Sequence, residues 1–345
     1  MTSSREPLVD VIVPTYGEPT YLAETLASVL AQTFTGFRVT VFDNGPGGGA
    51  AAAVVREFLG DPRVEYDVTG AVLPQVENWN RCLRATRARY VGMLHDDDRW
   101  RPGFLARRVA LLEAHPECAF AFAAMHDVDE GGAVVHAYPH RLAEGVHAPH
   151  AFVPLFLEEC LVGSPTPLVR RSAFEDVGLA WRKGIKNFDW ELWLHVAMRH
   201  PVGYLHARDS DRRVHGGSMT SASSGWGEEE LALLDRWEAL VARELPDVHW
   251  PARLRRRRRA HGHLIAAFDA LERDDAAHAR ASLRAAVTAH PPAIADPRVP
   301  AALLALAGGP PARRALTRAR TARVSPHLTT LRRTARDRLL RAARG

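Results

Sequence analysis

Apolar runs alternate with amphipathic stretches through the first third of this 345-residue chain. Apolar residues at helical spacing predict helices over residues 21–32, 50–59, 75–87 and 104–115. Between them, apolar and β-branched runs predict four strands: Leu8–Val13, Phe37–Phe42, Arg63–Tyr66 and Tyr90–Leu94. Strands that alternate with helices of this length form a mostly parallel sheet with helices on both faces, so the predicted fold class is α/β.

Three consecutive carboxylates, Asp96, Asp97 and Asp98, follow the last of these strands directly. Carboxylates this close repel one another, so a folded chain keeps them together where water or a cation neutralises them. An acidic surface turn is the plain alternative. The Trp100-Arg-Pro-Gly103 segment and the helical stretch behind it favour a ligand site instead, because ligands bind at the carboxyl ends of strands in α/β sheets. The triplet therefore predicts a divalent cation, Mg²⁺ or Mn²⁺, shared with phosphate oxygens.

The glycines of the chain do not form a nucleotide-binding motif. A dinucleotide fold needs G-x-G-x-x-G directly after its first strand, where this chain has Pro14-Thr15-Tyr16-Gly17. The sequence also lacks a G-x-x-x-x-G-K-[ST] loop. A bound diphosphate would therefore be held by the metal rather than by a glycine-rich loop.

Beyond residue 115 the sequence predicts strands at Cys118–Ala124 and Val202–His206 and helices at 151–160 and 188–199. From Trp226 the chain is helical and rich in Ala, Arg and Leu, with prolines that interrupt it. Residues 261–290 are expected to form two antiparallel helices joined at Asp274-Asp275. The predicted domains are 1–225, 226–311 (a helical extension) and 312–345 (a basic tail, helical or disordered).

The order of motifs resembles the family 2 glycosyltransferases, which have the GT-A fold. The resemblance covers residues 8–220 and depends on seven segments in this order: Val11–Tyr16, Val41–Gly45, Asn80, Asp96–Asp98, Val169–Phe174, Asp189 and Arg213–Ser218. Each segment alone is a weak signal, but their order is specific.

The resemblance implies an inverting transfer of a sugar from a nucleoside-diphosphate-sugar donor to a glycan or lipid-linked acceptor, in the synthesis of a cell-envelope or secondary glycan. Asp189 would be the catalytic base, with Glu191 as the second candidate. The implied metal ligands are Asp97, Asp98 and His215, and the implied donor-binding residues are Pro14, Thr15, Tyr16, Asp43, Asn80 and Asp96. Which of Asp96 and Asp98 is directed to the metal and which to the ribose stays open.

Several of these roles have a structural alternative. Asp43 precedes Gly45 as a turn-forming residue would, Asp189 could simply cap a helix, and His215 could be an ordinary loop residue. His95 stands where the family often has its first aspartate. Whether His95 is a local hydrogen-bonding residue or a metal ligand stays open.

Other function classes fit the sequence less well. A catalytically inactive GT-A-like protein that only binds nucleotide-sugars would not need the acidic triplet together with Asp189. Sugar-phosphate nucleotidyltransferases, which have a related fold, begin with a glycine-rich loop that is missing here. The remaining alternative is a surface adaptor that acts through the basic tail.

Charge is concentrated at the carboxyl terminus. Residues 312–345 hold eleven arginines and one aspartate, a net charge of +10. Because the whole chain carries +5, the remaining residues carry −5. Such a tail can contact an anionic membrane surface; a solvated helix face is the alternative, and no specific nucleic acid is expected. The three cysteines, Cys82, Cys118 and Cys160, lack metal-type spacing and predict a reduced, cytoplasmic protein, in reach of the inner face of the membrane.

Overall fold

The computed structural model describes residues 6–178, 188–215 and 226–322, which fall into two compact units. The first unit comprises residues 1–156 and 160–213, and the second comprises 157–159 and 214–345. The predicted boundary at residue 225 lies outside the described residues, and helix α13 (Gly309–Ala322) continues across the one predicted at residue 311. The three predicted domain ranges remain a prediction.

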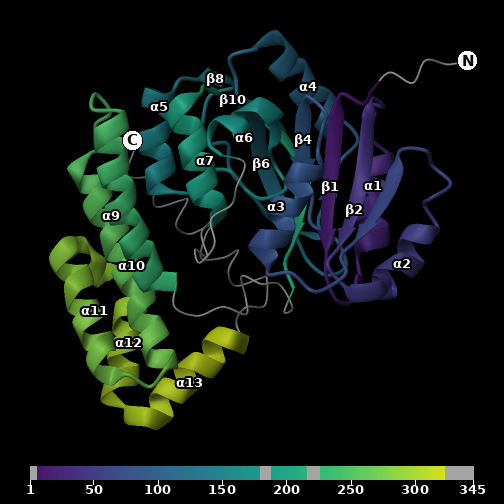
Figure 1. Ribbon diagram of the computed structural model, residues 1–345. Helices are drawn as coiled ribbons and strands as arrows, with labels where there is room; N and C mark the ends of the chain where they lie inside the picture. Colours follow the sequence, from purple (N-terminus) through teal and green to yellow (C-terminus); the bar gives the residue numbers. More distant parts are fainter. Residues whose placement is uncertain (1–5, 179–187, 216–225, 323–345) are drawn as a thin grey trace, which may run out of the picture. The chain divides into compact units, whose positions relative to one another are not determined.

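A single mixed sheet forms the centre of the first unit (Figure 1). Its strand order over the described residues is β3-β2-β1-β4-β9-β6-β10-β5, with β7 beside β6 and β8 beside β10. The pairs β2–β3, β1–β2, β1–β4 and β6–β10 are parallel, which confirms the mostly parallel sheet. The strands are β1 Val9–Thr15, β2 Phe37–Asp43, β3 Val64–Val68, β4 Tyr90–Met93, β5 Arg99–Trp100, β6 Phe120–Val128, β7 Val134–Ala137, β8 Gly145–His147, β9 Leu168–Arg170 and β10 Val202–Arg213.

Helices cover both faces of this sheet, as predicted (Figure 1). Side chains of α1, α2 and α4 pack with one face of β1, β2 and β4 in a continuous apolar core. Side chains of α3 and α7 meet the opposite face of β4. The helices of this unit are α1 Leu22–Leu30, η1 Pro46–Gly48, α2 Gly49–Arg56, α3 Gln75–Ala85, α4 Phe104–Ala114, α5 Pro149–Glu158, α6 Arg171–Asp176 and α7 Phe188–Arg199.

Several strands differ from the sequence prediction: the short strands β5, β7 and β8 were not predicted, and β6 ends four residues later than expected. Two further differences shape the middle of the sheet. β9 was not predicted; it lies antiparallel between β4 and β6 and joins the two parallel parts of the sheet. β10 continues seven residues beyond the predicted end at His206. Its added part, Arg208–Arg213, is charged and therefore lacks an apolar strand signal. These side chains are paired instead: Asp209 with Arg107 and Asp211 with Arg101, for example.

The second unit is helical in its described residues. The predicted helix pair joined at Asp274-Asp275 is present, although its first helix begins earlier, at Ala252. The Asp275 side chain caps the second helix by accepting a hydrogen bond from the His278 N–H (2.9 Å). The elements are α9 Trp226–Glu244, α10 Ala252–Glu272, α11 Ala276–Ala289, η2 Pro291–Ala295, α12 Arg298–Ala307 and α13 Gly309–Ala322. Among the described residues, no helix is long and apolar enough to cross a membrane.

Close helix packing in this unit depends on small residues. Alanines such as Ala267, Ala270 and Ala279 are fully buried between α10 and its neighbours. A Cβ atom at Gly227 would lie 2.1 Å from the main-chain nitrogen of Ala266, so only glycine permits this approach of α9 to α10. The Gly227 N–H donates to buried Asp269 across the same contact (3.0 Å).

Candidate functional site

The loop after β4 gathers three potential metal ligands. The Leu94 N–H donates to the Ile12 carbonyl (3.1 Å), which holds the start of the loop beside β1. The side chains of His95, Asp97 and Asp98 then bring one ligand atom each to within 4.8 Å of one another. Two carboxylates and an imidazole form a donor set that suits Mn²⁺, and the carboxylates alone suit Mg²⁺. The cluster therefore contains two of the three predicted ligands and adds His95.

The environment of Asp98 also fits a cation. This side chain is only 3% exposed, and burial, together with the nearby charge of Asp97, raises the pKa of its carboxyl well above the ordinary value. The Arg213 N–H donates to Asp98 Oδ1 (2.9 Å), which partly offsets this effect. A divalent cation would remove the repulsion between the two carboxylates, so the residues present fit the ion that the sequence predicts.

The main chain of the acidic loop is held from two sides. The Thr25 hydroxyl on α1 lies 2.8 Å from the Asp98 carbonyl and 3.0 Å from the Asp96 carbonyl. On the other side, Arg213 Nε donates to the Asp97 carbonyl (3.0 Å). The orientation of the carboxylates is therefore set by contacts that reach from α1 and from the end of β10.

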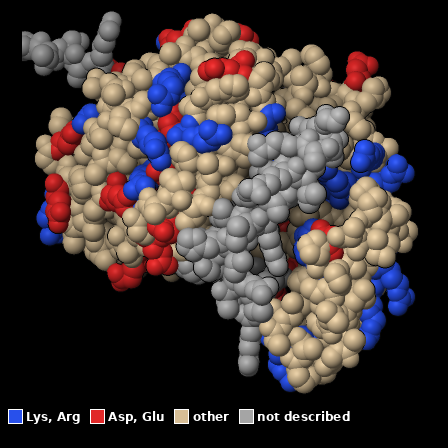
Figure 2. Space-filling model, turned by 180° about the vertical axis from the view of Figure 1, so that it is seen from behind, with Lys and Arg blue, Asp and Glu red and all other residues tan. Residues whose placement is uncertain are grey.

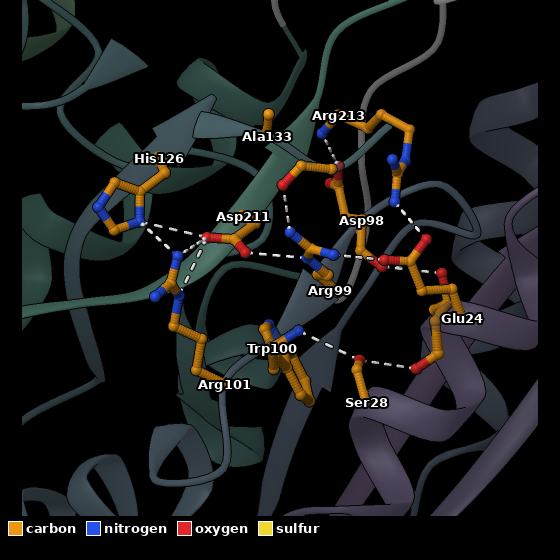
Figure 3. A network of polar contacts seen from close by, with 12 residues as sticks. Glu24, Ser28, Asp98, Arg99, Trp100, Arg101, His126, Ala133, Asp211 and Arg213 are labelled. Carbon is orange, nitrogen blue, oxygen red and sulfur yellow. Dashed lines mark hydrogen bonds and ion pairs between the residues drawn. The ribbon is translucent and has the colours of Figure 1, made fainter. Parts of the chain in front are cut away.

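Arg213 connects this loop to the surrounding elements. Its guanidinium donates to the carbonyls of Asp129 (3.1 Å) and Glu130 (2.8 Å) in the turn after β6. It also pairs with Glu24 on α1 (2.6 Å) and lies over the Tyr21 ring, 4.1 Å from the centroid. Figure 3 shows Arg213 between Asp98 and Glu24, with Arg99 bonded to the same Glu24.

We expect an Arg213→Lys variant to bind the metal more weakly and to turn over more slowly, although the charge is kept. A lysine ammonium cannot reproduce the forked contacts of a guanidinium, so the acidic loop would lose its fixed geometry. Contacts that orient metal ligands are typically worth about 10–100-fold in metal affinity or activity. Manganese titration and kcat/KM would show the loss, with Arg89→Lys, at the exposed ion pair with Glu113, as the control. Wild-type values for Arg213→Lys would contradict this role.

The predicted donor-binding residues lie along the ends of β1 and β2. Thr15, the last residue of β1, donates its hydroxyl hydrogen to Asp96 Oδ2 (2.5 Å). Burial raises the pKa of Asp96, and this hydrogen bond opposes the shift. Pro14 is buried within β1, whereas the Tyr16 ring is 64% exposed at its end. Tyr16 is therefore free to stack on a ligand, and Asp96 is separate from the three-residue metal cluster.

Asp43 forms a turn with Gly45, which is the structural role predicted as the alternative to donor binding. Its Oδ1 accepts a hydrogen bond from the Gly45 N–H (2.8 Å), and its Oδ2 accepts one from the Tyr66 hydroxyl (2.6 Å). Each carboxylate oxygen can accept a second hydrogen bond, so a nucleotide contact remains compatible with this geometry. Asn80, also predicted to bind the donor, is buried on α3.

A narrow, mostly apolar pocket adjoins the metal cluster. Its lining includes Trp79, Ser164 and Asp189. Trp79 packs near the His95 ring (5.1 Å between centroids), and Ser164 Oγ lies 3.2 Å from His95 Nε2. The candidate base and the candidate metal ligands are thus connected through two shared neighbours.

Of the two candidate bases, only Asp189 lines this pocket. Burial raises the pKa of its carboxyl, while a hydrogen bond that Oδ1 accepts from the Trp190 N–H (2.8 Å) opposes the shift. Glu191 is 2% exposed, and its Oε1 lies 3.8 Å from His195 Nε2 within the same helix. The structure therefore gives Asp189 access to a ligand in the pocket and turns Glu191 toward the core.

The loop that carries Ser164 is fixed by two buried side chains. Trp100 Nε1 donates to the Pro165 carbonyl (2.7 Å), and Arg108 Nε donates to the Thr166 carbonyl (2.7 Å). Arg108 is fully buried; its guanidinium also donates to Asp209 (3.0 Å). Sequence reasoning missed the roles of Ser164 and Arg108, because neither belongs to a motif with a recognisable spacing.

Comparison with known proteins agrees with this geometry. Residues 10–178 match the model of the family described as Glycosyl transferase family 2. These 169 residues, just under half of the chain, form a glycosyltransferase family 2 domain. The chain is similar to the putative teichuronic acid biosynthesis glycosyltransferase TuaG of Bacillus subtilis, with 24% identity over 58% of this chain and 75% of TuaG.

Other relatives match over a smaller share of their length. The uncharacterized glycosyltransferase MJ1057 of Methanocaldococcus jannaschii is 24% identical over 55% of this chain and 64% of its own. The uncharacterized protein y4gI of Sinorhizobium fredii is 28% identical over 36% of this chain and 14% of its own. This chain therefore spans less than two thirds of each of these two relatives.

Solved structures with low sequence identity share the GT-A fold. Staphylococcus aureus TarS 1–349 in complex with UDP-GlcNAc aligns with a TM-score of 0.56 and 16% identity, over 95% of this chain and 92% of TarS. The mannosyltransferase PcManGT of Pyrobaculum calidifontis, in complex with GDP-Man and Mn²⁺, aligns with a TM-score of 0.50 and 19% identity, over 94% and 87% of the two chains.

One predicted site residue, His215, belongs to the second unit, so the described geometry of the first unit does not include it. Its role as a metal ligand remains a prediction. The Gly216-Gly217-Ser218 segment that follows it lies outside the described residues.

Proposed function

We propose that this glycosyltransferase moves a sugar from a nucleoside-diphosphate-sugar to an acceptor hydroxyl, with inversion and with Mg²⁺ or Mn²⁺ as its cofactor. The observation that carries the proposal is the pairing of the His95, Asp97 and Asp98 cluster with a pocket that contains Asp189. The complexes of TarS with UDP-GlcNAc and of PcManGT with GDP-Man and Mn²⁺ support the choice of donor and of ion.

In the proposed reaction His95, Asp97 and Asp98 would hold the cation. Bound there, a divalent cation supplies Lewis-acid stabilisation to the diphosphate leaving group as the glycosidic bond breaks. Asp96, held by Thr15, and the exposed Tyr16 would bind the ribose and base of the donor.

Asp189 would take the proton from the acceptor hydroxyl. A hydroxyl is a weak nucleophile at neutral pH, and a carboxylate with a raised pKa is a stronger base than an ordinary aspartate. The apolar walls of the pocket, formed by side chains such as Trp79, Leu83 and Trp193, would limit the access of water. This arrangement favours transfer over hydrolysis of the donor.

The acceptor is assigned only by class. TuaG is named for teichuronic acid biosynthesis, which supports an acceptor in a cell-envelope glycan. The free cysteines, two of which are buried, support a reduced, cytoplasmic setting for the reaction.

A donor screen by thermal shift tests the proposal. Nucleoside-diphosphate-sugars would be added with Mn²⁺, with Mg²⁺ or with a chelator, and a ligand at 100 times its Kd stabilises the native state by about 2.7 kcal/mol. We expect stabilisation by a donor that requires the cation, followed by metal-dependent release of the nucleoside diphosphate when an acceptor is supplied. Donor binding without any release would indicate an inactive binding protein instead.

A further inference from the structure

Helix α12 in the second unit lacks a polar outer face. After Arg298 its sequence, Val299–Ala307, contains only apolar residues. Val299, Ala302 and Leu306 face the helical core. Leu303, at the edge of this side, is 52% exposed, and Leu304, on the far side, is 73% exposed. A helix at the surface of a soluble domain ordinarily carries polar residues on that side, and one that is apolar all round is ordinarily covered.

A neighbouring exposed side chain extends this surface. Ile294 lies in η2, which packs against α12, and is 64% exposed. Ile294, Leu303 and Leu304 are the large hydrophobic side chains that the described part of the second unit exposes. Their grouping on two successive elements indicates an interaction surface rather than scattered exposure. We call Ile294, Leu303 and Leu304 the apolar surface.

Arginines of α10 lie beside the start of this surface. Arg253 and Arg256 are exposed, and neither forms an ion pair within the described part of the chain. After burial, the charges of Arg253, Arg257 and Arg256 are the causes that lower the pKa of His290. The start of α10 lies beside the end of α11 in this antiparallel pair, and His290 directly precedes η2, so these positive charges lie close to the segment that carries Ile294.

In Figure 2 the helical unit, at the lower right, shows an area with few charged side chains and with arginines along its edge. Arg314, which is exposed shortly after the end of α12, adds a further positive charge beyond that helix.

The basic flank decides between the partners that could cover an apolar surface. In a symmetric dimer the same surface of each subunit meets its copy, so the apolar side chains of the second chain would supply no anionic partner for Arg253 and Arg256. An anionic lipid surface satisfies both features, because apolar side chains enter the interface while arginines pair with headgroups.

We propose that the apolar surface of the helical unit, with Arg253 and Arg256, docks peripherally on an anionic membrane. This places membrane contact on a folded surface rather than only on the basic tail, whose residues 323–345 lie outside the described part of the chain. The proposal does not depend on the identity of the donor or of the cation.

Vesicle co-sedimentation of the full chain tests it. The vesicles would consist of phosphatidylcholine alone or of an equal mixture of phosphatidylcholine and phosphatidylglycerol. We expect binding to the mixed vesicles, weakened by salt because the arginine contribution is screened. The Leu303→Gln/Leu304→Gln double variant should bind at least about tenfold more weakly than the wild type, because glutamine keeps helix propensity and removes the apolar contact.

The charge contribution is tested separately. Arg253→Gln/Arg256→Gln should lower the partition coefficient on mixed vesicles by about 30-fold, the loss expected for two basic residues near an anionic surface. Leu59→Gln, an equally conservative change at a 49% exposed leucine of the first unit, is the matched control and should bind as the wild type does.

Two results would overturn the proposal. Wild-type binding by the Leu303→Gln/Leu304→Gln variant, which retains the basic tail, would show that the tail alone makes the contact. Absence of vesicle binding together with a concentration-dependent dimer that this variant abolishes, measured by sedimentation velocity, would show that a second copy covers the surface. Thermal unfolding of each variant would confirm that it is folded.

Discussion

Replacement of Asp97 by asparagine is expected to abolish sugar transfer while leaving the fold intact. Asparagine has nearly the same shape as aspartate, but it removes one of the two negative charges in the metal cluster. A catalytic cation contributes several kcal/mol to charge stabilisation in the transition state, so its loss should lower kcat by about 100-fold or more. Donor turnover at saturating Mn²⁺ and manganese titration would measure the effect.

The fold of this variant should be nearly unchanged. Asp97 contributes its main-chain carbonyl, not its side chain, to the bond with Arg213, and that bond is retained. Asp235→Asn, at a 65% exposed side chain of the helical unit, is the control for loss of a single negative charge. Full turnover of the Asp97 variant in a chelating buffer would contradict the site. A His95→Asn variant in the same titration resolves the open role of His95: a ligand role predicts weaker metal binding.

The first half of the sheet was predictable because its strands are buried. Every residue of β1 is buried, and such strands appear in the sequence as continuous apolar runs that turn residues interrupt. The four predicted strands over residues 8–94 therefore agree with β1 to β4 apart from a few terminal residues. The ends differ because Thr15 and Asp43, although polar, continue to pair with each other across β1 and β2.

The second half was less predictable because its strands depend on partners far away in the chain. β9 has three residues, too few for a period, and it exists because it pairs with both β4 and β6. The charged end of β10 is stable because most of its charges meet one of the opposite sign from another element, such as Arg212 with Asp127, while Arg208 donates to the Tyr138 carbonyl (2.6 Å). The local sequence pattern contains neither the pairing partners of β9 nor the ion-pair partners of β10.

The candidate site shows the same division. Consecutive aspartates after a buried strand indicate a cation site by themselves, and a strand order is enough to place Thr15 close to them. In contrast, the contacts of Arg213 with the acidic loop, and of Ser164 with His95, join residues that are far apart in the sequence. Sequence spacing could not distinguish Asp189 from Glu191 either; only the pocket separates them.

An Asp189→Asn variant is expected to lose about 100-fold or more in turnover with a normal affinity for donor and metal. Loss of a general base typically costs about 10²–10⁴-fold, and asparagine cannot accept the proton. The side-chain oxygen of asparagine can still accept the Trp190 N–H, so the free energy of unfolding should change by less than about 1 kcal/mol. Glu191→Gln is the comparison. If Asp189→Asn kept its turnover and Glu191→Gln lost it, Glu191 would be the base instead.

The pH dependence of the wild-type protein gives an independent readout of Asp189. Burial raises the pKa of this carboxyl, so kcat/KM should fall as pH decreases through a value above about 3.9, the ordinary pKa of aspartate. The asparagine variant should lack this acid limb.

The stability of the protein should depend on pH in the opposite direction from that of a salt-bridged carboxylate. Between the ordinary and the raised pKa the native state binds more protons than the unfolded state, so stability falls as pH rises through this window. The asparagine variant does not titrate and should lose less stability over the same window. An acid limb that persists in the variant would assign the titration to another group.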